Sequence, residues 1–132
     1  MNDEFVDRVA VGVNEAVAAG WPDLTGAVWL VERAGAVCGS LALTDEGDGF
    51  GRLRWFVLEP SLRGRGLGNS LVAELVARAR ADGYQRLELE TFSALTVAAR
   101  IYRAVGFRLT WERERHDWGA PIVYQQYQLE LD

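Results

Sequence analysis

The chain contains no lysine, and it has one cysteine, one histidine and one methionine among its 132 residues. A single cysteine, Cys38, excludes an internal disulfide, and its position in a predicted strand indicates a buried, inert thiol. All 14 basic residues are arginines, so the protein has no lysine side chain of its own to be acylated.

Long apolar runs are also missing. The longest is far below the ~18–20 residues that cross a bilayer, so we expect no membrane span. The start of the chain, Met1–Glu4, is acidic and lacks the basic and apolar blocks of a signal peptide, which favours the cytoplasm. The net charge of −5 disfavours a nucleic-acid partner. No pattern of metal ligands is present, so we expect no metal.

The composition is that of a soluble globular protein, with 49% apolar and 25% charged residues. A chain of 132 residues is long enough for one core but not for two. We therefore predict a single domain over residues 1–132.

Apolar periodicity and turn residues predict nine elements. A first helix is expected over residues 3–19, where Phe5, Val9, Val13 and Val17 recur at helical spacing. Two further helices are expected over 69–80 and 95–105, the second with Leu95, Ala98, Tyr102 and Val105 on one face. Strands are expected over 27–33, 36–43, 53–58, 87–90, 108–114 and 123–131, with loops at 45–49 and 115–121.

The predicted order, α-β-β-β-α-β-α-β-β, indicates an α/β protein with a mixed sheet. Its hairpins are antiparallel, whereas the strand–helix–strand unit over residues 53–91 requires one parallel, right-handed crossover.

A glycine-rich turn, Arg63–Gly68, lies between a predicted strand and a predicted helix. Its glycines, at alternate positions, expose backbone N–H groups to a ligand. The helix N-terminus adds a positive dipole end, and Arg63 and Arg65 add full charges. This combination favours a phosphate or pyrophosphate.

Two other phosphate-binding folds fit less well. A dinucleotide-binding fold also has glycines between strand and helix, and Glu90 lies where a ribose-binding acid would be expected. Here, however, three strands precede the motif and only one parallel crossover is predicted. A phosphate-loop nucleotidase requires a Gly-Lys-Ser/Thr sequence, and the chain has no lysine.

The motif Arg63-x-x-Gly66-x-Gly68 resembles the acyl-CoA pyrophosphate motif of the GCN5-related N-acetyltransferases (GNAT). Tyr102-x-x-x-Gly106-Phe107 resembles that family's later signature. The style of residues 91–93, 98–107 and 116–119 is most similar to the acetyltransferase half of fusions with a MarR-type helix-turn-helix domain. The resemblance implies a GNAT fold, with a mostly antiparallel sheet and helices on both faces.

The resemblance also implies roles for individual residues. Backbone groups of Phe56, Val57 and Leu58 would bind pantetheine between two diverging strands, and Tyr102 would protonate the departing CoA thiolate. A buried helix tyrosine with a purely structural role is the alternative for Tyr102. The pyrophosphate would lie on the amides of Arg63, Gly64, Arg65, Gly66, Leu67 and Gly68, with Asn69 and Ser70 in the first helical turn.

The chain departs from this family at three places. Many relatives have an asparagine that binds pantetheine where this chain has Leu95, and Ser93 or Thr96 is a candidate replacement. The usual first strand is missing from the predicted elements, and one N-terminal helix is predicted instead of two. A homodimer contact or a missing fusion partner is therefore expected to cover the exposed sheet edge.

The implied reaction is direct transfer of an acetyl group from acetyl-CoA to an amine in a ternary complex, with the Leu58 amide at the oxyanion. Glu90 is the first candidate for the base, and Glu59 is a second carboxylate near the site. His116 and Trp118, in the last loop, are candidate acceptor contacts. The aromatic residues there are expected to be core or hairpin packing rather than a cation-binding cage.

A second reading is a module that binds acyl-CoA as a sensor or partner-binding unit without turnover. The missing asparagine favours it, whereas Tyr102 favours catalysis. The residues do not name the acceptor, a small-molecule or peptide amine, although the acidic balance favours a cationic one.

Overall fold

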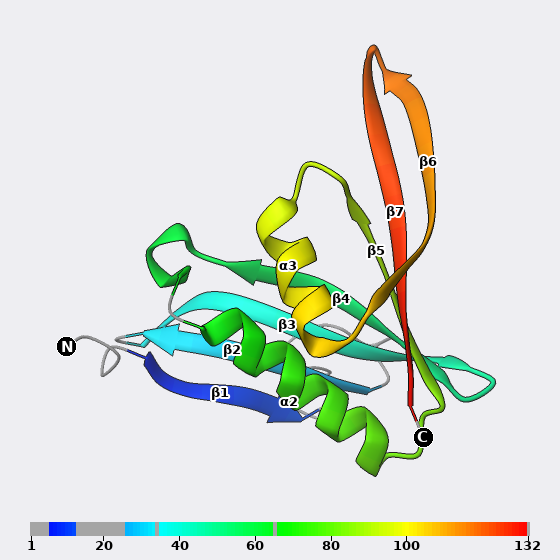
Figure 1. The fold of residues 1–132 in the computed structure, drawn as a ribbon. Helices are drawn as coiled ribbons and strands as arrows, with labels where there is room; N and C mark the ends of the chain where they lie inside the picture. The colour runs from blue at the N-terminus through cyan, green and yellow to red at the C-terminus, as the bar shows by residue number, and fades with distance from the viewer. Residues whose placement is uncertain (1–5, 13–25, 34, 65, 132) are drawn as a thin grey trace.

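The computed structural model describes residues 6–12, 26–33, 35–64 and 66–131 (Figure 1). The strands form one sheet in the order β1-β2-β3-β4-β5-β7-β6. None of the helices in these residues is long and apolar enough to cross a membrane. The strands are β1 (Val6–Gly12), β2 (Gly26–Arg33), β3 (Ala36–Gly47), β4 (Phe50–Leu58), β5 (Arg86–Phe92), β6 (Arg108–Trp118) and β7 (Ala120–Glu130).

The predicted helix over residues 3–19 is wrong for the part that the structure describes. Val6–Gly12 forms β1, which pairs antiparallel with β2 and occupies the sheet edge that was expected to lack its first strand. An apolar spacing of four residues fits a helix, but it is also compatible with a strand because four is a multiple of two. Residues 13–19 lie outside the described part.

Strands β3 and β4 are longer than predicted because the expected loop at 45–49 is mostly strand. Asp48 and Gly49 alone make the turn, with φ of 55° and 80°. Positive φ at both central residues is the geometry of a two-residue hairpin whose twist matches the flanking strands. The polar ends of both strands continue the ladder up to this turn.

The parallel crossover is confirmed, and it is short. β4 pairs with β5 only from Phe50 to Arg52, opposite Arg86 to Glu88. Beyond that point β4 has a register shift against β3, where Trp55 takes a φ of 54° and Ser40 Oγ donates to the Trp55 carbonyl at 2.7 Å. Such a bulge bends a strand, and here the bend accompanies the divergence of β4 from β5.

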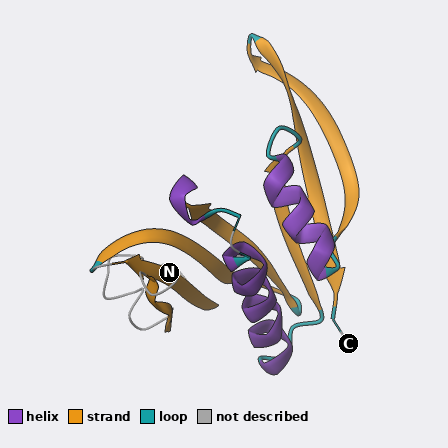
Figure 2. Cartoon of the chain, turned by 60° about the vertical axis from the view of Figure 1, so that its left-hand side comes forward, coloured by secondary structure: helices purple, strands orange, loops and turns teal. Residues whose placement is uncertain are grey.

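Both described α-helices lie on one face of the sheet, where α2 (Leu67–Ala81) and α3 (Thr96–Val105) pack against each other (Figure 2). Leu71, Val72 and Leu75 of α2 are fully buried in one core together with Tyr102 of α3. Trp29 Nε1 donates to Glu74 at 3.1 Å and ties β2 to α2. A second, small cluster on the other face contains Val28, Ala42 and Leu30. The resemblance implies helices on both faces, and the described residues show them on one face; residues 13–25 lie outside the described part.

The last hairpin, β6–β7, extends beyond the other strands (Figure 1). The predicted loop at 115–121 is wrong, because the strands continue to a tight turn at Gly119, where φ is 93°. Side chains alternate along β6, so Glu112 and Glu114 lie on one face of the hairpin and Arg113 and Arg115 on the other.

Gly39 sets how closely β3 approaches the end of β4. A Cβ at this position would lie 2.7 Å from Leu58 Cδ2 and 3.0 Å from the Val57 carbonyl oxygen. We predict that Gly39→Ala lowers the free energy of unfolding by ~1–3 kcal/mol, because the backbone of Val57 must shift. The measurement is chemical denaturation. The double variant Gly39→Ala/Leu58→Ala should lose less than the sum of the single variants; additive losses would contradict a direct clash.

Candidate active site

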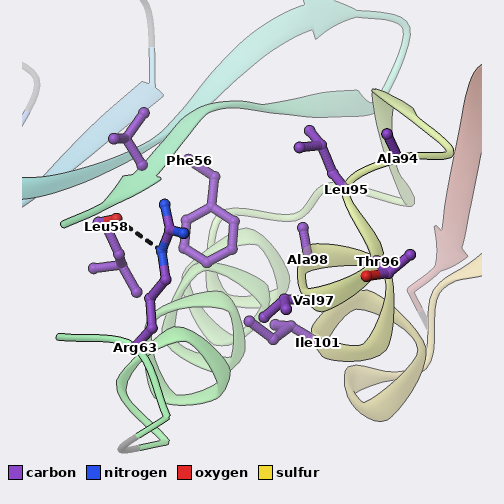
Figure 3. A pocket seen from close by; sticks show the side chains of 10 residues that line it. Phe56, Leu58, Arg63, Ala94, Leu95, Thr96, Val97, Ala98 and Ile101 are labelled. Atoms are coloured by element: carbon purple, nitrogen blue, oxygen red, sulfur yellow. Dashed lines mark hydrogen bonds between the residues drawn. The ribbon is translucent and has the colours of Figure 1, made fainter. Parts of the chain in front are cut away.

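A cavity of about 390 Å³ opens where β4 and β5 have diverged (Figure 3). Phe56, Val57 and Leu58, at the end of β4, line one side together with Arg63. The start of α3 and the residues before it line the other side: Ala94, Leu95, Thr96, Val97, Ala98 and Ile101. Four of the residues predicted for cofactor binding therefore meet in one place.

The α3 side of the cavity was missed by the sequence analysis, except for Leu95 and Thr96. Ala94, Val97, Ala98 and Ile101 follow one another at i, i+3, i+4 and i+7, which is the spacing of one helical face, although Ala94 lies in the turn just before α3. That periodicity was the available signal. The predicted core face was partly wrong, because Leu95 lies at the start of α3 with 49% of its surface exposed, whereas Ala99 is buried.

Arg63 is held at the cavity by the backbone of β4. Its Nε donates to the Leu58 carbonyl oxygen at 3.2 Å, which directs the guanidinium along the cavity beside Phe56 (Figure 3). The short helix η2 (Pro60–Leu62) sets this geometry, because it returns the chain after β4 and buries Leu62 beneath it.

Helix α2 begins at the glycine turn without a capping side chain and without an acidic residue in its first turn. Its first N–H groups therefore have no intrahelical acceptor, and the positive end of its dipole is not compensated locally. Asn69 and Ser70 lie exposed in this turn, and Leu67 packs against the core. This arrangement suits an anion. Arg65 lies outside the described residues.

Glycine is required at the three positions of the turn for different structural reasons. Gly64 and Gly66 have φ of 80° and 77°, and a Cβ on either would meet nothing within 4 Å. Their requirement is conformational. Gly68 instead packs closely, since a Cβ there would lie 2.7 Å from Ile101 Cδ1 and 3.3 Å from Phe56 Cζ. It allows α2 to approach two residues that line the cavity.

Tyr102 lies behind the cavity and does not line it. The residue is 5% exposed, and its ring packs between Phe56, Phe107 and Tyr127, with centroid distances of 6.1, 6.0 and 5.8 Å. Burial, and then the proximity of Tyr127, raises the pKa of Tyr102 far above its usual value. The phenol therefore keeps its proton throughout the neutral range.

The remaining candidates are dispersed. Glu90 is exposed on β5, and its cross-strand neighbour is Gln126 of β7. Glu59 is exposed at the start of η2. Ser93 is exposed just before α3 and does not line the cavity, whereas Thr96 does.

His116 is exposed on β6, within 3.3 Å of Glu114, and is also not a lining residue. The backbone of Trp118 ends β6 at the hairpin turn. Among the described residues no group of three or more metal-ligating side chains occurs.

Comparison with known proteins places this geometry in context. The model of the Acetyltransferase (GNAT) family matches residues 5–107. An IAA acetyltransferase from Azospirillum brasilense is 34% identical over 80 residues, which cover 59% of this chain and 52% of that protein. An uncharacterized N-acetyltransferase from Schizosaccharomyces pombe is 30% identical over 83 residues, covering 63% and 50%. The chain thus spans about half the length of these curated relatives.

Solved structures show the same fold. A putative acetyltransferase from Salmonella typhimurium with its cofactor acetyl-CoA has a TM-score of 0.73 at 23% identity, covering 92% of this chain and 75% of that one. A GNAT family acetyltransferase from Elizabethkingia anophelis with acetyl-CoA bound has a TM-score of 0.69 at 17% identity, covering 89% and 82%.

The burial of Tyr102 makes a prediction about stability at high pH. The pKa of Tyr102 in the folded protein lies above its unfolded value near 10, so its contribution is complete below pH 10. Above pH 10 the unfolded chain releases this proton while the folded protein retains it, so stability falls as pH rises. Tyr102→Phe should remove ~1 kcal/mol of that fall between pH 10 and 11.

Thermal unfolding of both proteins between pH 8 and 11 measures this difference. Tyr84, whose pKa is also raised by burial, should leave a residual slope in both. Equal slopes in the wild type and in Tyr102→Phe would contradict the buried, protonated phenol.

Proposed function

Because the chain belongs to the Acetyltransferase (GNAT) family, we propose that it transfers an acetyl group from acetyl-CoA to a primary amine. The observation that carries this proposal is the cavity at the divergence of β4 and β5, next to the uncapped start of α2 and to Arg63. A long, thin cofactor with an anionic middle fits an apolar slot that ends beside a cation and a helix N-terminus.

In the proposed complex, pantetheine lies along Phe56, Val57 and Leu58, where β4 has no neighbouring strand on its β5 side. Its amides would replace the missing strand by bonding to backbone groups. The pyrophosphate would lie on the N–H groups of the glycine turn and of the first turn of α2, with Arg63 as a charged partner. Leu95, in place of an asparagine, would contribute apolar contact only.

The transfer itself is proposed as direct attack by a neutral amine on the thioester carbonyl. An alkylamine has a pKa near 10.4, so its deprotonation at pH 7 costs ~4.6 kcal/mol, which a base should reduce. We assign this role to Glu90, directly or through a water molecule. The amide of Leu58 stabilises the oxyanion, and CoA leaves as a thiol after it accepts a proton from Tyr102.

Phe56 lines the cavity, and Tyr102 packs against its ring without lining the cavity itself. Proton delivery from Tyr102 therefore requires the sulfur of CoA to reach the edge of Phe56. The position of Tyr102 outside the cavity lining also supports the alternative function, a module that binds acyl-CoA without turnover. The two readings differ in one measurable respect, the release of CoA in the presence of an amine.

The proposal covers residues 1–132 as one acyltransferase domain. We also propose that a second copy of this chain or a fused MarR-type domain covers an exposed edge of the sheet. Among the described strands, the two at the ends of the sheet are β1 and β6, so these are the edges open to such a partner.

Binding of the cofactor is tested with Arg63→Gln. Loss of one charge-assisted contact to the pyrophosphate should raise the Kd for CoA ~10–100-fold, as measured by calorimetry. Arg80→Gln, which removes an exposed arginine of α2, is the matched control and should leave the Kd unchanged. Equal affinities of wild type and Arg63→Gln would contradict the assigned cofactor position.

Turnover is tested by thiol release from acetyl-CoA across a panel of amines. Tyr102→Phe should lower kcat ~10²–10⁴-fold and leave the Kd for CoA within a factor of about two, because the lost group acts only as an acid. Tight CoA binding without thiol release on any amine would favour the binding module. An unchanged kcat would remove Tyr102 from the mechanism.

A further inference from the structure

The sheet face turned away from the helices, called here the outer face, carries a set of charged residues beside the proposed reaction site. Residues paired directly across strands share a face, and Leu89 and Tyr127 belong to the helix-side core. Glu88 and Glu90 of β5 therefore lie on the outer face. Arg52 of β4 lies there too, since its Nη2 is 3.4 Å from Glu88 Oε1.

Two side chains of β3 hold Arg54 on the outer face. Its Nε–H donates to Thr44 Oγ1 at 3.0 Å, and its Nη2 donates to Glu46 Oε2 at 3.2 Å. The hydrogen bond from Thr44 and the charge of Arg54 hold the pKa of Glu46 below its usual range, so this ion pair persists at neutral pH. The two bonds use two of five guanidinium donors, and 36% of the Arg54 side chain remains exposed.

The neighbouring carboxylate, Glu88, is already satisfied. It accepts from Arg52, from Arg86 at 3.0 Å and from Gln128 at 2.9 Å, and its side chain is only 9% exposed. Three guanidinium groups, those of Arg52, Arg54 and Arg86, thus share two carboxylates, Glu46 and Glu88. The cluster carries one excess positive charge, and Arg54, 36% exposed, is its member two residues beyond Arg52, on the side of the opening.

The topology places this charge opposite the proposed base. Arg52 and Glu88 form the last pair before the strands diverge. Two residues further along each strand, and still on the outer face, come Arg54 on β4 and Glu90 on β5. A positive and a negative side chain therefore stand on opposite sides of the opening at which the thioester would end.

We propose that the acceptor amine also carries an anionic group, as an α-amino acid does, with its amine beside Glu90 and its carboxylate bound by Arg54. This inference rests on the proposed function. A guanidinium binds a carboxylate with paired hydrogen bonds, whereas it repels the second cation of a polyamine. The net charge of −5 had favoured a cationic acceptor, but the charges at the opening are the ones that a small substrate meets.

The test compares matched acceptors: α-amino acids, their carboxamides, the corresponding decarboxylated amines and spermidine. We expect kcat/KM for the amino acids to exceed that for the carboxamides by ~10-fold or more. The α-amine of a carboxamide has a lower pKa and is more often neutral at pH 7, so intrinsic reactivity would give the opposite order.

Arg54→Gln should raise KM for the amino acids ~10–100-fold and change the carboxamides by less than about threefold. Arg54→Lys, which retains the charge, should recover part of the loss. Such a recovery would show that the loss in Arg54→Gln does not come from a folding defect. Arg80→Gln is the control for net charge. Melting curves verify that each variant is folded.

Equal use of acids and carboxamides, a preference for spermidine, or an equal loss on both acceptors in Arg54→Gln would overturn this inference alone. The proposed function would then still stand, because amines are acetylated. CoA binding without turnover on any acceptor would instead overturn the proposed function, and this inference with it.

Discussion

The site depends on one constraint, the early end of the parallel pairing between β4 and β5. Only three residues of each strand are in register, and the bulge at Trp55 turns the rest of β4 away. Backbone groups on that side of β4 must be satisfied by something other than a strand. Phe56 and Leu58 pack near Gly68 of α2, so this end of β4 contacts a helix rather than β5. The cavity, the position of Arg63 and the two charged sides of the opening all follow from this divergence.

The two faces of the sheet have different chemistry at the opening. On the helix side the lining is almost entirely apolar, with Arg63 at one end, as a thin cofactor tail requires. On the outer face the same strands present guanidinium and carboxylate groups. The alternation of side chains along β4 and β5 separates these two environments within one layer of backbone. Cofactor and acceptor can therefore approach the same point from opposite sides without sharing contacts.

Much of this arrangement could be predicted from the sequence. The glycine turn, α2 and the single crossover were predicted because each has a strong local signal: positive-φ glycines, a clean apolar stripe and the Gly83 stop. β1 was missed because a four-residue apolar spacing fits a helix and a strand equally. The long ends of β3 and β6 were missed because consecutive residues there are polar on both faces, which resembles a loop. The burial of Tyr102 depends on Phe56, Phe107 and Tyr127 together, and no local pattern encodes that packing.

The alternation along β6 has a consequence for self-recognition. Two antiparallel copies of this edge, related by a twofold axis through the sheet, would bring residues of the same parity opposite one another. With the axis at Arg113, Glu112 would face Glu114 and Arg113 would face its own copy. With the axis at Glu114, Arg113 would face Arg115 and Glu114 would face its own copy. Like charges directly opposite destabilise strand pairing. Self-pairing of the edge strand β6 in these registers is thereby disfavoured. Lysines often have this role on edge strands, and the chain contains none.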